Sequence, residues 1–557
     1  MTASDPCALT HARRRFGLFD MAAALLIFLF STMLVFRFSL IDFDPHHTGL
    51  MYKTALDVSR GQVIFRDTFS QYGALTALLQ AAAIRLFGER VSSILLSTAF
   101  FYGFDYFLFF LLARRFFDRT TAVLTTAAAV FLAPYFMWDF HPWSSVYALF
   151  FLLVTALLVW RAETRRPCLF YALAGLSSAL AFWCRQPVGW VCLLATLLCP
   201  LALWFLTHRA YPEQKKTRLL SLAAAFGGAG AGVLLFLIPI AAVGAFDAFV
   251  KQNFSFTFSL AVSFSERGGV VGMLFYRLFL APLIEDRLWL AYVWFLLPLL
   301  SLTLLALSAR RLHRAAHAHD ETERATATLR LIFALFAIAS WHQYYPVSCH
   351  RHWYWAALPS LLSALLLITD LARWLAAKKQ WKEGARRGCA ALLIVLLLGP
   401  GLGYRLYTAV GKVTATARME RFENEHYPDM NGLYLEPAEA LHYRETFEDA
   451  ALLHELFPET NIINVTYNGI YSVVGENFCC YFTDMTTLLP DEYPDLLQAY
   501  IDEHRPVVFT DEQPDETYRL WRMPAGETGD PFADQHRLPA GFWLPVELYD
   551  RLPAAYR

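Results

Sequence analysis

The chain has 557 residues, of which 57% are hydrophobic and 17% are charged, and its mean hydropathy is +0.37. Soluble domains carry about 25% charged residues. The composition therefore excludes an ordinary soluble protein and predicts an integral, multi-pass protein of the plasma or inner membrane. With a net charge of -1 there is no basic face for nucleic acid, so we expect no nucleic-acid partner.

The first hydrophobic segment, residues 16–38, follows Arg13, Arg14 and Arg15. It is too long for the core of a signal peptide, and no small-residue cleavage site follows it. We expect it to stay in the membrane as a signal anchor.

Apolar segments long enough to cross a hydrocarbon core recur along the chain, and they predict an α-helical polytopic membrane protein with about 11 transmembrane helices. The predicted spans are 16–38, 92–113, 120–138, 143–160, 168–184, 188–206, 218–243, 290–308, 327–341, 353–373 and 389–408. Arg and Lys cluster in alternate loops, on the side of the N-terminus. The positive-inside rule then predicts a cytoplasmic N-terminus and an extracytoplasmic C-terminus. Without the short span 327–341, the last two spans and the tail would reverse.

Two parts of different polarity follow from this pattern. Residues 1–409 form the predicted transmembrane module, with a first outer loop at 39–91, and residues 410–557 form a polar extracytoplasmic domain. In that domain a β-rich run at 461–469 precedes a helical pattern and a second β-rich run at 505–511. This order predicts a small α/β unit.

The polar stretch after the first span is the strongest candidate for a functional site. It carries Asp42, Asp44, His46 and His47. Titratable groups at a bilayer surface cost free energy when they are kept away from water, so their presence there points to function. Asp105, in the middle of a span, is instead expected to make a structural contact with an Arg or Tyr of a neighbouring helix.

The rest of the first outer loop contains no span. Apolar residues alternate there with Lys53, Asp57 and Arg85, and Gly61 and Gly73 interrupt the pattern. We predict two amphipathic helices on the membrane surface. A packing platform with no chemistry is the alternative.

This arrangement resembles the GT-C glycosyltransferases, and in pattern especially the protein O-mannosyltransferases and the lipid A aminoarabinose transferases. Asp44 stands at the acidic site of the family's first outer loop, Gly61 at the end of its short helix, and residues 71–88 at its closing stretch. The relatives usually have an adjacent Asp-Glu pair, which this chain lacks. The base is therefore either Asp44, which we favour, or Asp42.

The resemblance implies a glycosyltransferase of the hexosyl or pentosyl class that uses a polyprenyl-phosphate sugar on the extracytoplasmic face. It also implies inversion, with a carboxylate as general base that takes the proton of an acceptor hydroxyl. The acceptor is a protein, a lipid or a cell-envelope glycan. A transporter or flippase and a polysaccharide polymerase or ligase are the alternatives. Against transport, we find no internal repeat.

A lipid-phosphate leaving group requires cations, and Arg suits phosphate geometry. Arg185 resembles the cation in the Lys-Gly stretch of the aminoarabinose transferases, and Arg351 directly precedes a span. Alternatively, Arg185 anchors the end of a helix, and Arg351 extends its charged group to the membrane interface. Arg66 and Tyr354 are further candidates for substrate binding.

Histidines gather in the segments predicted to lie outside: His46, His47, His141, His342, His350 and His352. Hydrogen bonding to sugar or phosphate, a divalent metal site with Asp42 or Asp44, and decoration of the aromatic belt all stay open. No HxxxH or HExxH spacing supports a metal cofactor.

Overall fold

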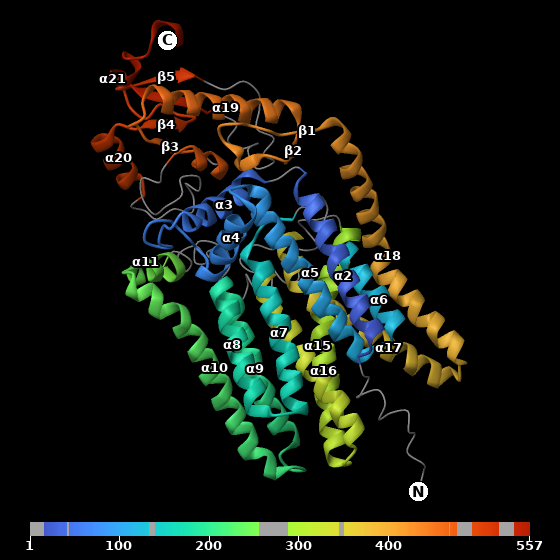
Figure 1. Ribbon diagram of the computed structural model, residues 1–557. Helices are drawn as coiled ribbons and strands as arrows, with labels where there is room; N and C mark the ends of the chain where they lie inside the picture. The colour runs from blue at the N-terminus through green and yellow to red at the C-terminus, as the bar shows by residue number, and fades with distance from the viewer. Residues whose placement is uncertain are drawn as a thin grey trace.

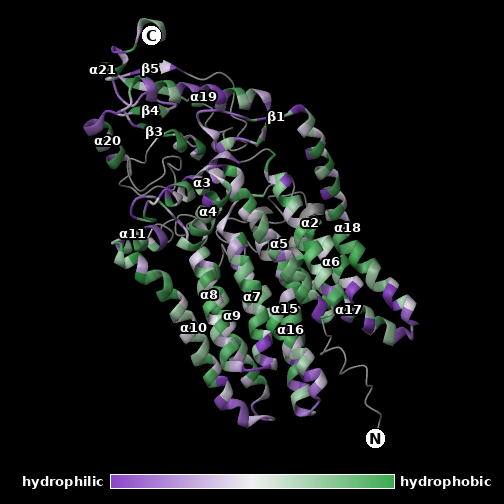
Figure 2. Ribbon diagram, viewed as in Figure 1, coloured by the Kyte–Doolittle hydropathy of each residue, from purple (hydrophilic) through white to green (hydrophobic). Residues whose placement is uncertain are grey.

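The computed structural model describes residues 16–41, 44–132, 140–255, 288–344, 350–466, 468–475, 493–522 and 540–557. In this part of the chain, ten helices are long and apolar enough to cross a membrane. They are α2 (Leu18–Ser39), α5 (Val91–Phe116), α7 (Ser144–Thr164), α8 (Pro167–Cys184), α9 (Gln186–Thr207), α10 (Lys215–Ala242), α15 (Leu288–His317), α16 (Glu321–Ala339), α17 (His350–Lys379) and α18 (Glu383–Ala415). They form one bundle of largely hydrophobic helices, as Figures 1 and 2 show. The prediction of an integral membrane protein is confirmed.

Each of these ten helices matches a predicted span, the short one at 327–341 included. The remaining prediction, 120–138, begins in α6 (Arg119–Leu132), and the end of that predicted span lies outside the described residues. Short elements join several helices: η1 (Pro212–Gln214), α11 (Phe246–Val250), η2 (Lys251–Ser255), η4 (Ser340–Tyr344) and η5 (Thr416–Arg418).

One end of the bundle collects the basic loops. The contacts that join them are Asp20 with Arg114 and Arg119, Arg115 with Trp160, Glu163 with Arg218, and Asp370 with Arg311. The other end of α2 contacts the C-terminal region, where the Leu40 carbonyl accepts a bond from the Tyr434 amide. The basic loops and the C-terminal region therefore lie at opposite ends of the bundle (Figure 1).

The first outer loop forms two helices, α3 (Pro45–Ser59) and α4 (Ala74–Phe87), as predicted. Gly61 follows α3 with a φ of 99°, a left-handed conformation that glycine adopts without a steric penalty. Its position explains why the helix ends there. Gly73 and Gly88 flank α4 in the same way that the sequence indicated.

α3 is more deeply buried than we expect for an amphipathic helix on a membrane surface. Nearly all its side chains are buried, the expected polar face included. Lys53 and Asp57, one turn apart on that face, form a buried ion pair at 2.7 Å. The cause is the C-terminal region, which covers α3 on the side away from the bundle (Figure 1).

The C-terminal region holds two small sheets. β1 (Glu420–Arg421) pairs antiparallel with β2 (Tyr434–Leu435), and the larger sheet has the order β3-β4-β6-β5. Its strands are β3 (Ile462–Asn464), β4 (Val507–Thr510), β5 (Tyr518–Arg522) and β6 (Gly541–Pro545), with helices α19 (Pro437–Leu456), α20 (Tyr493–His504) and α21 (Val546–Tyr549) and the short turns η6 (Pro428–Met430), η7 (Gly469–Val474) and η9 (Ala554–Tyr556). β3 and β4 are parallel, and α20 forms the crossover between them. The predicted strand, helix and strand are confirmed.

A close backbone contact docks this region onto α3. A Cβ atom added to Gly49 would lie 2.2 Å from the amide nitrogen of Ile470 and 2.5 Å from the carbonyl carbon of Gly469. Only glycine allows η7 to approach the helix so closely. The guanidinium of Arg37 also lies over the Tyr434 ring, 4.5 Å from its centroid.

Candidate functional site

Asp44 is the N-cap of α3. Its carboxylate accepts a hydrogen bond from the His47 amide at 2.9 Å, and Pro45 occupies the first helical position. Asp followed by Pro is a favoured helix start, because the side chain satisfies a free amide and proline needs none. The positive end of the helix dipole favours a negative charge at this point.

Two histidines surround this carboxylate. Nδ1 of His47 lies 2.7 Å from Oδ2 of Asp44, and Nε2 of His141 lies 3.7 Å from the same oxygen. The His46 ring is fully buried and meets the His47 ring edge-on. Three of the predicted outward histidines are thus brought together around Asp44.

Aromatic rings continue from the histidines toward Arg185. The His47 ring lies 5.1 Å from that of Trp143, and Trp143 lies 5.2 Å from Tyr72. The guanidinium of Arg185 lies 5.5 Å from the centroid of the Tyr72 ring. We call these residues, Asp44, His47, His141, Trp143, Tyr72 and Arg185, the Asp44–Arg185 cluster.

Arg185 occupies the break between α8 and α9, where it is both the C-cap residue of α8 and the N-cap residue of α9. It is 9% exposed, and it donates to the Ser145 hydroxyl at 2.6 Å. Ser145 in turn lies 3.3 Å from Oε1 of Gln343. Trp355 also faces the guanidinium, 5.9 Å from its ring centroid. The guanidinium of arginine suits the geometry of a phosphate.

The other predicted residues lie in different places. Arg66 is half exposed, pairs with Asp67 at 2.8 Å and donates to the Val243 carbonyl, so in the described structure it ties the first outer loop to the end of α10 and contacts no member of the cluster. Asp42 lies outside the described residues. His350, Arg351, His352 and Tyr354 lie at the start of α17, and their side chains lie outside the described part of the structure.

Sequence reasoning missed three members of the site. Tyr72, Ser145 and Gln343 carry no charge, and none stands in a motif with a chemical spacing. Their only signal is position, since Tyr72 directly precedes the glycine that begins α4 and Ser145 lies in the first turn of α7. In the described part of the chain, no group of three or more His, Cys, Asp or Glu residues is arranged to hold a metal ion.

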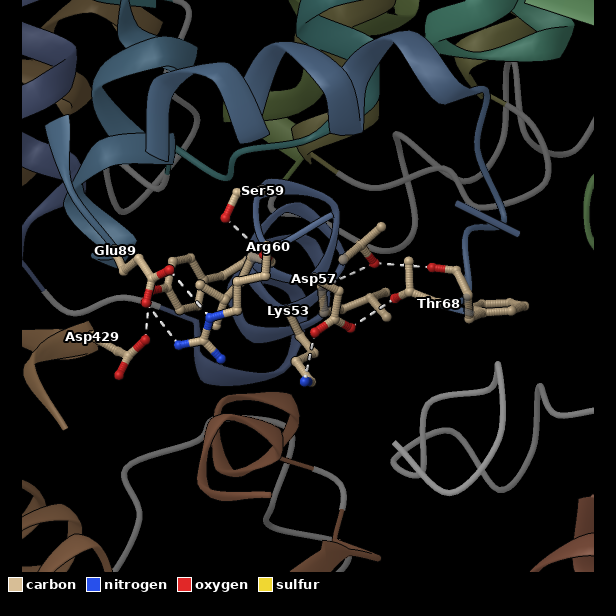
Figure 3. A network of polar contacts seen from close by, with 12 residues as sticks. Lys53, Asp57, Ser59, Arg60, Thr68, Glu89 and Asp429 are labelled. Atoms are coloured by element: carbon tan, nitrogen blue, oxygen red, sulfur yellow. Dashed lines mark hydrogen bonds and ion pairs between the residues drawn. The ribbon is translucent and has the colours of Figure 1, made fainter. Parts of the chain in front are cut away.

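A second network of polar contacts, shown in Figure 3, runs along α3. Asp57 accepts from Lys53 and, at 2.9 Å, from the Thr68 hydroxyl, which ties α3 to the loop that follows it. At its C-terminal end Arg60 binds Glu89 through two N–H groups, at 3.2 and 2.7 Å. These bonds fix the helix that carries Asp44.

The same network reaches the C-terminal region. The hydroxyl of Tyr52 donates to Asp429 at 2.5 Å, and burial raises the pKa of both groups. By contrast, the hydrogen bonds from Arg60 lower the pKa of Glu89. The C-terminal end of α3 is therefore held by Glu89, and its middle is held by Asp429 from the C-terminal region.

The expected partner of Asp105 is not found. Asp105 is fully buried in α5, and neither carboxylate oxygen accepts a hydrogen bond from any residue that the structure describes. Among the residues that the structure describes, the predicted contact with an Arg or Tyr of a neighbouring helix is not seen.

No family model matches the chain, and no curated protein matches it. Among solved structures, ArnT from Cupriavidus metallidurans in the apo state matches with a TM-score of 0.52 and 13% identity, over 95% of this chain and 99% of that one. The same protein bound to undecaprenyl phosphate gives a TM-score of 0.47 with 13% identity, over 88% and 92% of the two chains. The apo oligosaccharyltransferase of Archaeoglobus fulgidus gives 0.49 with 13% identity, over 88% and 69%. The similarity to apo ArnT shows that this chain shares the fold of that protein, in agreement with the predicted fold class.

Proposed function

We propose that the protein is a membrane glycosyltransferase that moves a sugar from a polyprenyl-phosphate donor to an acceptor hydroxyl, with Asp44 as the general base. The observation that carries this proposal is the Asp44–Arg185 cluster. It joins a carboxylate to a guanidinium through aromatic rings at one end of a membrane bundle. The GT-C fold and the family resemblance of residues 16–90 support the donor class.

In this mechanism the acceptor oxygen attacks the anomeric carbon while Asp44 takes its proton. The bond from that carbon to the phosphate oxygen breaks, and its electron pair leaves with the lipid phosphate. Arg185 stabilises the negative charge that grows on the phosphate. A single displacement of this kind inverts the anomeric centre. His47 and His141 hold the Asp44 carboxylate in place.

We further propose that residues 1–409 form the catalytic module and 410–557 an extracytoplasmic domain that covers it. The end of the bundle that carries the cluster would then face the outside, because the basic loops lie at the opposite end and prefer the cytoplasm.

The test uses the full chain in nanodiscs with a panel of radiolabelled polyprenyl-phosphate sugars, and it follows release of polyprenyl phosphate. Asp44→Asn separates the charge of Asp44 from its role as N-cap, because Asn caps helices as well as Asp does. It removes the charge and keeps the start of α3. We expect a loss of about 100-fold or more in turnover with donor binding retained.

Two variants control this result. Asp320 is the exposed N-cap of α16, at the basic end of the bundle, so Asp320→Asn makes the same change at a remote helix start and should leave turnover intact. Asp42→Asn tests the other candidate base. Full turnover in Asp44→Asn would refute the role of Asp44, and failure of every donor to bind would refute a lipid-phosphate glycosyltransferase.

A further inference from the structure

A cavity of about 580 Å³ lies where the C-terminal end of α3 meets the C-terminal region. Arg60 and Glu89 line one side, and Tyr427 and Asp429 line a second. Its volume falls within the roughly 300–1,000 Å³ of small-molecule sites. We call it the Arg60–Asp429 pocket. Of the residues that line it, none belongs to the Asp44–Arg185 cluster.

The charge of the pocket disfavours anions. Its lining carries three carboxylates, Glu89, Asp429 and Glu459, against the single guanidinium of Arg60. Two histidines, His426 and His454, complete its ionisable groups. Glu89 already neutralises Arg60 through two hydrogen bonds, so two carboxylates remain beyond that pair. A phosphate, sulfate or uronic acid would meet repulsion here. A lipid phosphate is therefore a poor occupant, unlike at Arg185.

The polar atoms of the pocket instead suit a ligand that both donates and accepts hydrogen bonds. Carboxylates only accept, whereas the Asn461 amide, which also lines the pocket, both donates and accepts. The Tyr427 ring, itself packed on Phe447 with 5.3 Å between the centroids, offers an apolar wall. Burial raises the pKa of Tyr427 to about 12, so its hydroxyl stays a neutral donor.

A sugar ring has this combination of chemistry, with hydroxyl groups around its edge and C–H groups on its face. We propose that the Arg60–Asp429 pocket binds a neutral saccharide, and that it holds a remote part of a glycan acceptor. The second clause rests on the proposed glycosyltransferase function. Asp44 and Arg60 cap the two ends of α3, whose 15 residues span about 22 Å. An extended oligosaccharide could therefore be anchored at one end of α3 and receive sugar at the other.

The test measures glycan binding directly, with the full chain in nanodiscs on an array of neutral, amine-bearing and anionic oligosaccharides. Thr460 lines the pocket, is half-buried and bonds through its backbone to Phe457. Thr460→Trp should therefore fill the cavity and leave the surrounding contacts in place. We expect wild type to bind neutral glycans and Thr460→Trp to bind them at least ten-fold more weakly.

Two further variants separate charge from fold. Glu459→Gln removes a lining carboxylate and should weaken binding several-fold, whereas Glu455→Gln changes an exposed residue of α19 outside the pocket and should have no effect. Thermal unfolding of Thr460→Trp should match that of wild type, which shows that the protein is folded. No binding of neutral glycans by wild type, a preference for anionic glycans, or equal binding by Thr460→Trp would overturn the pocket assignment. Neutral glycan binding that Thr460→Trp abolishes would support the pocket even if no sugar donor were turned over, so the two proposals fail separately.

Discussion

At the scale of single residues, the site depends on how Asp44 is held. His47 contacts its carboxylate twice, through the backbone amide and through a ring nitrogen. The amide contact belongs to the helix cap and would form in many sequences. The ring contact depends on the residue at position 47, because it needs a side chain whose ring nitrogen reaches the carboxylate.

His47 is therefore expected to position the base. His47→Ala removes the ring and should lower turnover about 10-fold to 100-fold, within the range that general-base catalysis supplies. His47→Asn retains an N–H donor near the place of Nδ1 and should recover part of the loss. The measurement is polyprenyl-phosphate release over a pH series. Equal losses in both variants would show that the ring does more than orient Asp44.

A second residue-scale prediction concerns Tyr52 and Asp429. Tyr52→Phe leaves a buried carboxylate without its hydroxyl donor and should cost about 1–3 kcal/mol of stability. Asp429→Asn keeps an acceptor for Tyr52 and removes a buried charge, so it should be nearly neutral or stabilising. Thermal unfolding in detergent distinguishes the two, and a larger loss in Asp429→Asn would contradict this account.

The same pair predicts a pH dependence. Because burial raises the pKa of Asp429, the folded state favours its protonated form, and that stabilisation is lost as the pH rises through the raised value. Asp429→Asn cannot lose it. The melting temperature of the variant relative to wild type should thus increase from pH 4 to pH 7. A constant difference across this range would show that Asp429 does not titrate there.

At the scale of elements, much of the architecture could be predicted because hydrophobic length and charge act locally. The membrane helices, the start of α3 at Asp44 and the glycines that end α3 and flank α4 are all visible in the sequence. The burial of α3 could not be predicted, because the C-terminal region that covers it is far away in the sequence. The residues around Arg185 could not be predicted for the same reason, since Tyr72, Ser145 and Gln343 come from three distant elements.

The close approach of α3 and η7 gives an element-scale prediction. Gly49→Ala places a methyl group against the backbone of Gly469 and Ile470, so the two elements must separate. We expect faster hydrogen exchange in residues 461–475 and reduced turnover, because α3 carries Asp44. Gly227→Ala in α10 is the matched control, since a Cβ there meets nothing within 4 Å. Unchanged exchange in Gly49→Ala would mean that η7 tolerates the extra group.

At the scale of the whole molecule, the two ends of the bundle have different characters. Basic loops with their ion pairs lie at one end, and the C-terminal region lies at the other (Figure 2). The Asp44–Arg185 cluster includes the N-cap of α3, the helix that the C-terminal region covers. This division agrees with the predicted topology, in which the cytoplasmic side is the basic one.

The orientation can be measured by cysteine labelling in intact cells. Cys168 is exposed near the start of α8, close to the basic loop at 161–166. As the only cysteine it should react with a membrane-impermeant maleimide after lysis alone. Glu516→Cys, an exposed position before β5, should react in intact cells as the only cysteine. The reverse pattern would invert the topology.

The bond between Tyr52 and Asp429 joins residues 377 positions apart. At ribosomal speeds of about 5–20 residues per second, the first waits roughly 20–75 seconds for the second to be made. During that time α3 has left the ribosome without the partner that buries it. Catalytic competence is thus expected late in biogenesis, after α18 has been inserted and the last part of the chain has folded onto α3. A nascent or prematurely terminated chain would insert its transmembrane helices and still lack the completed site.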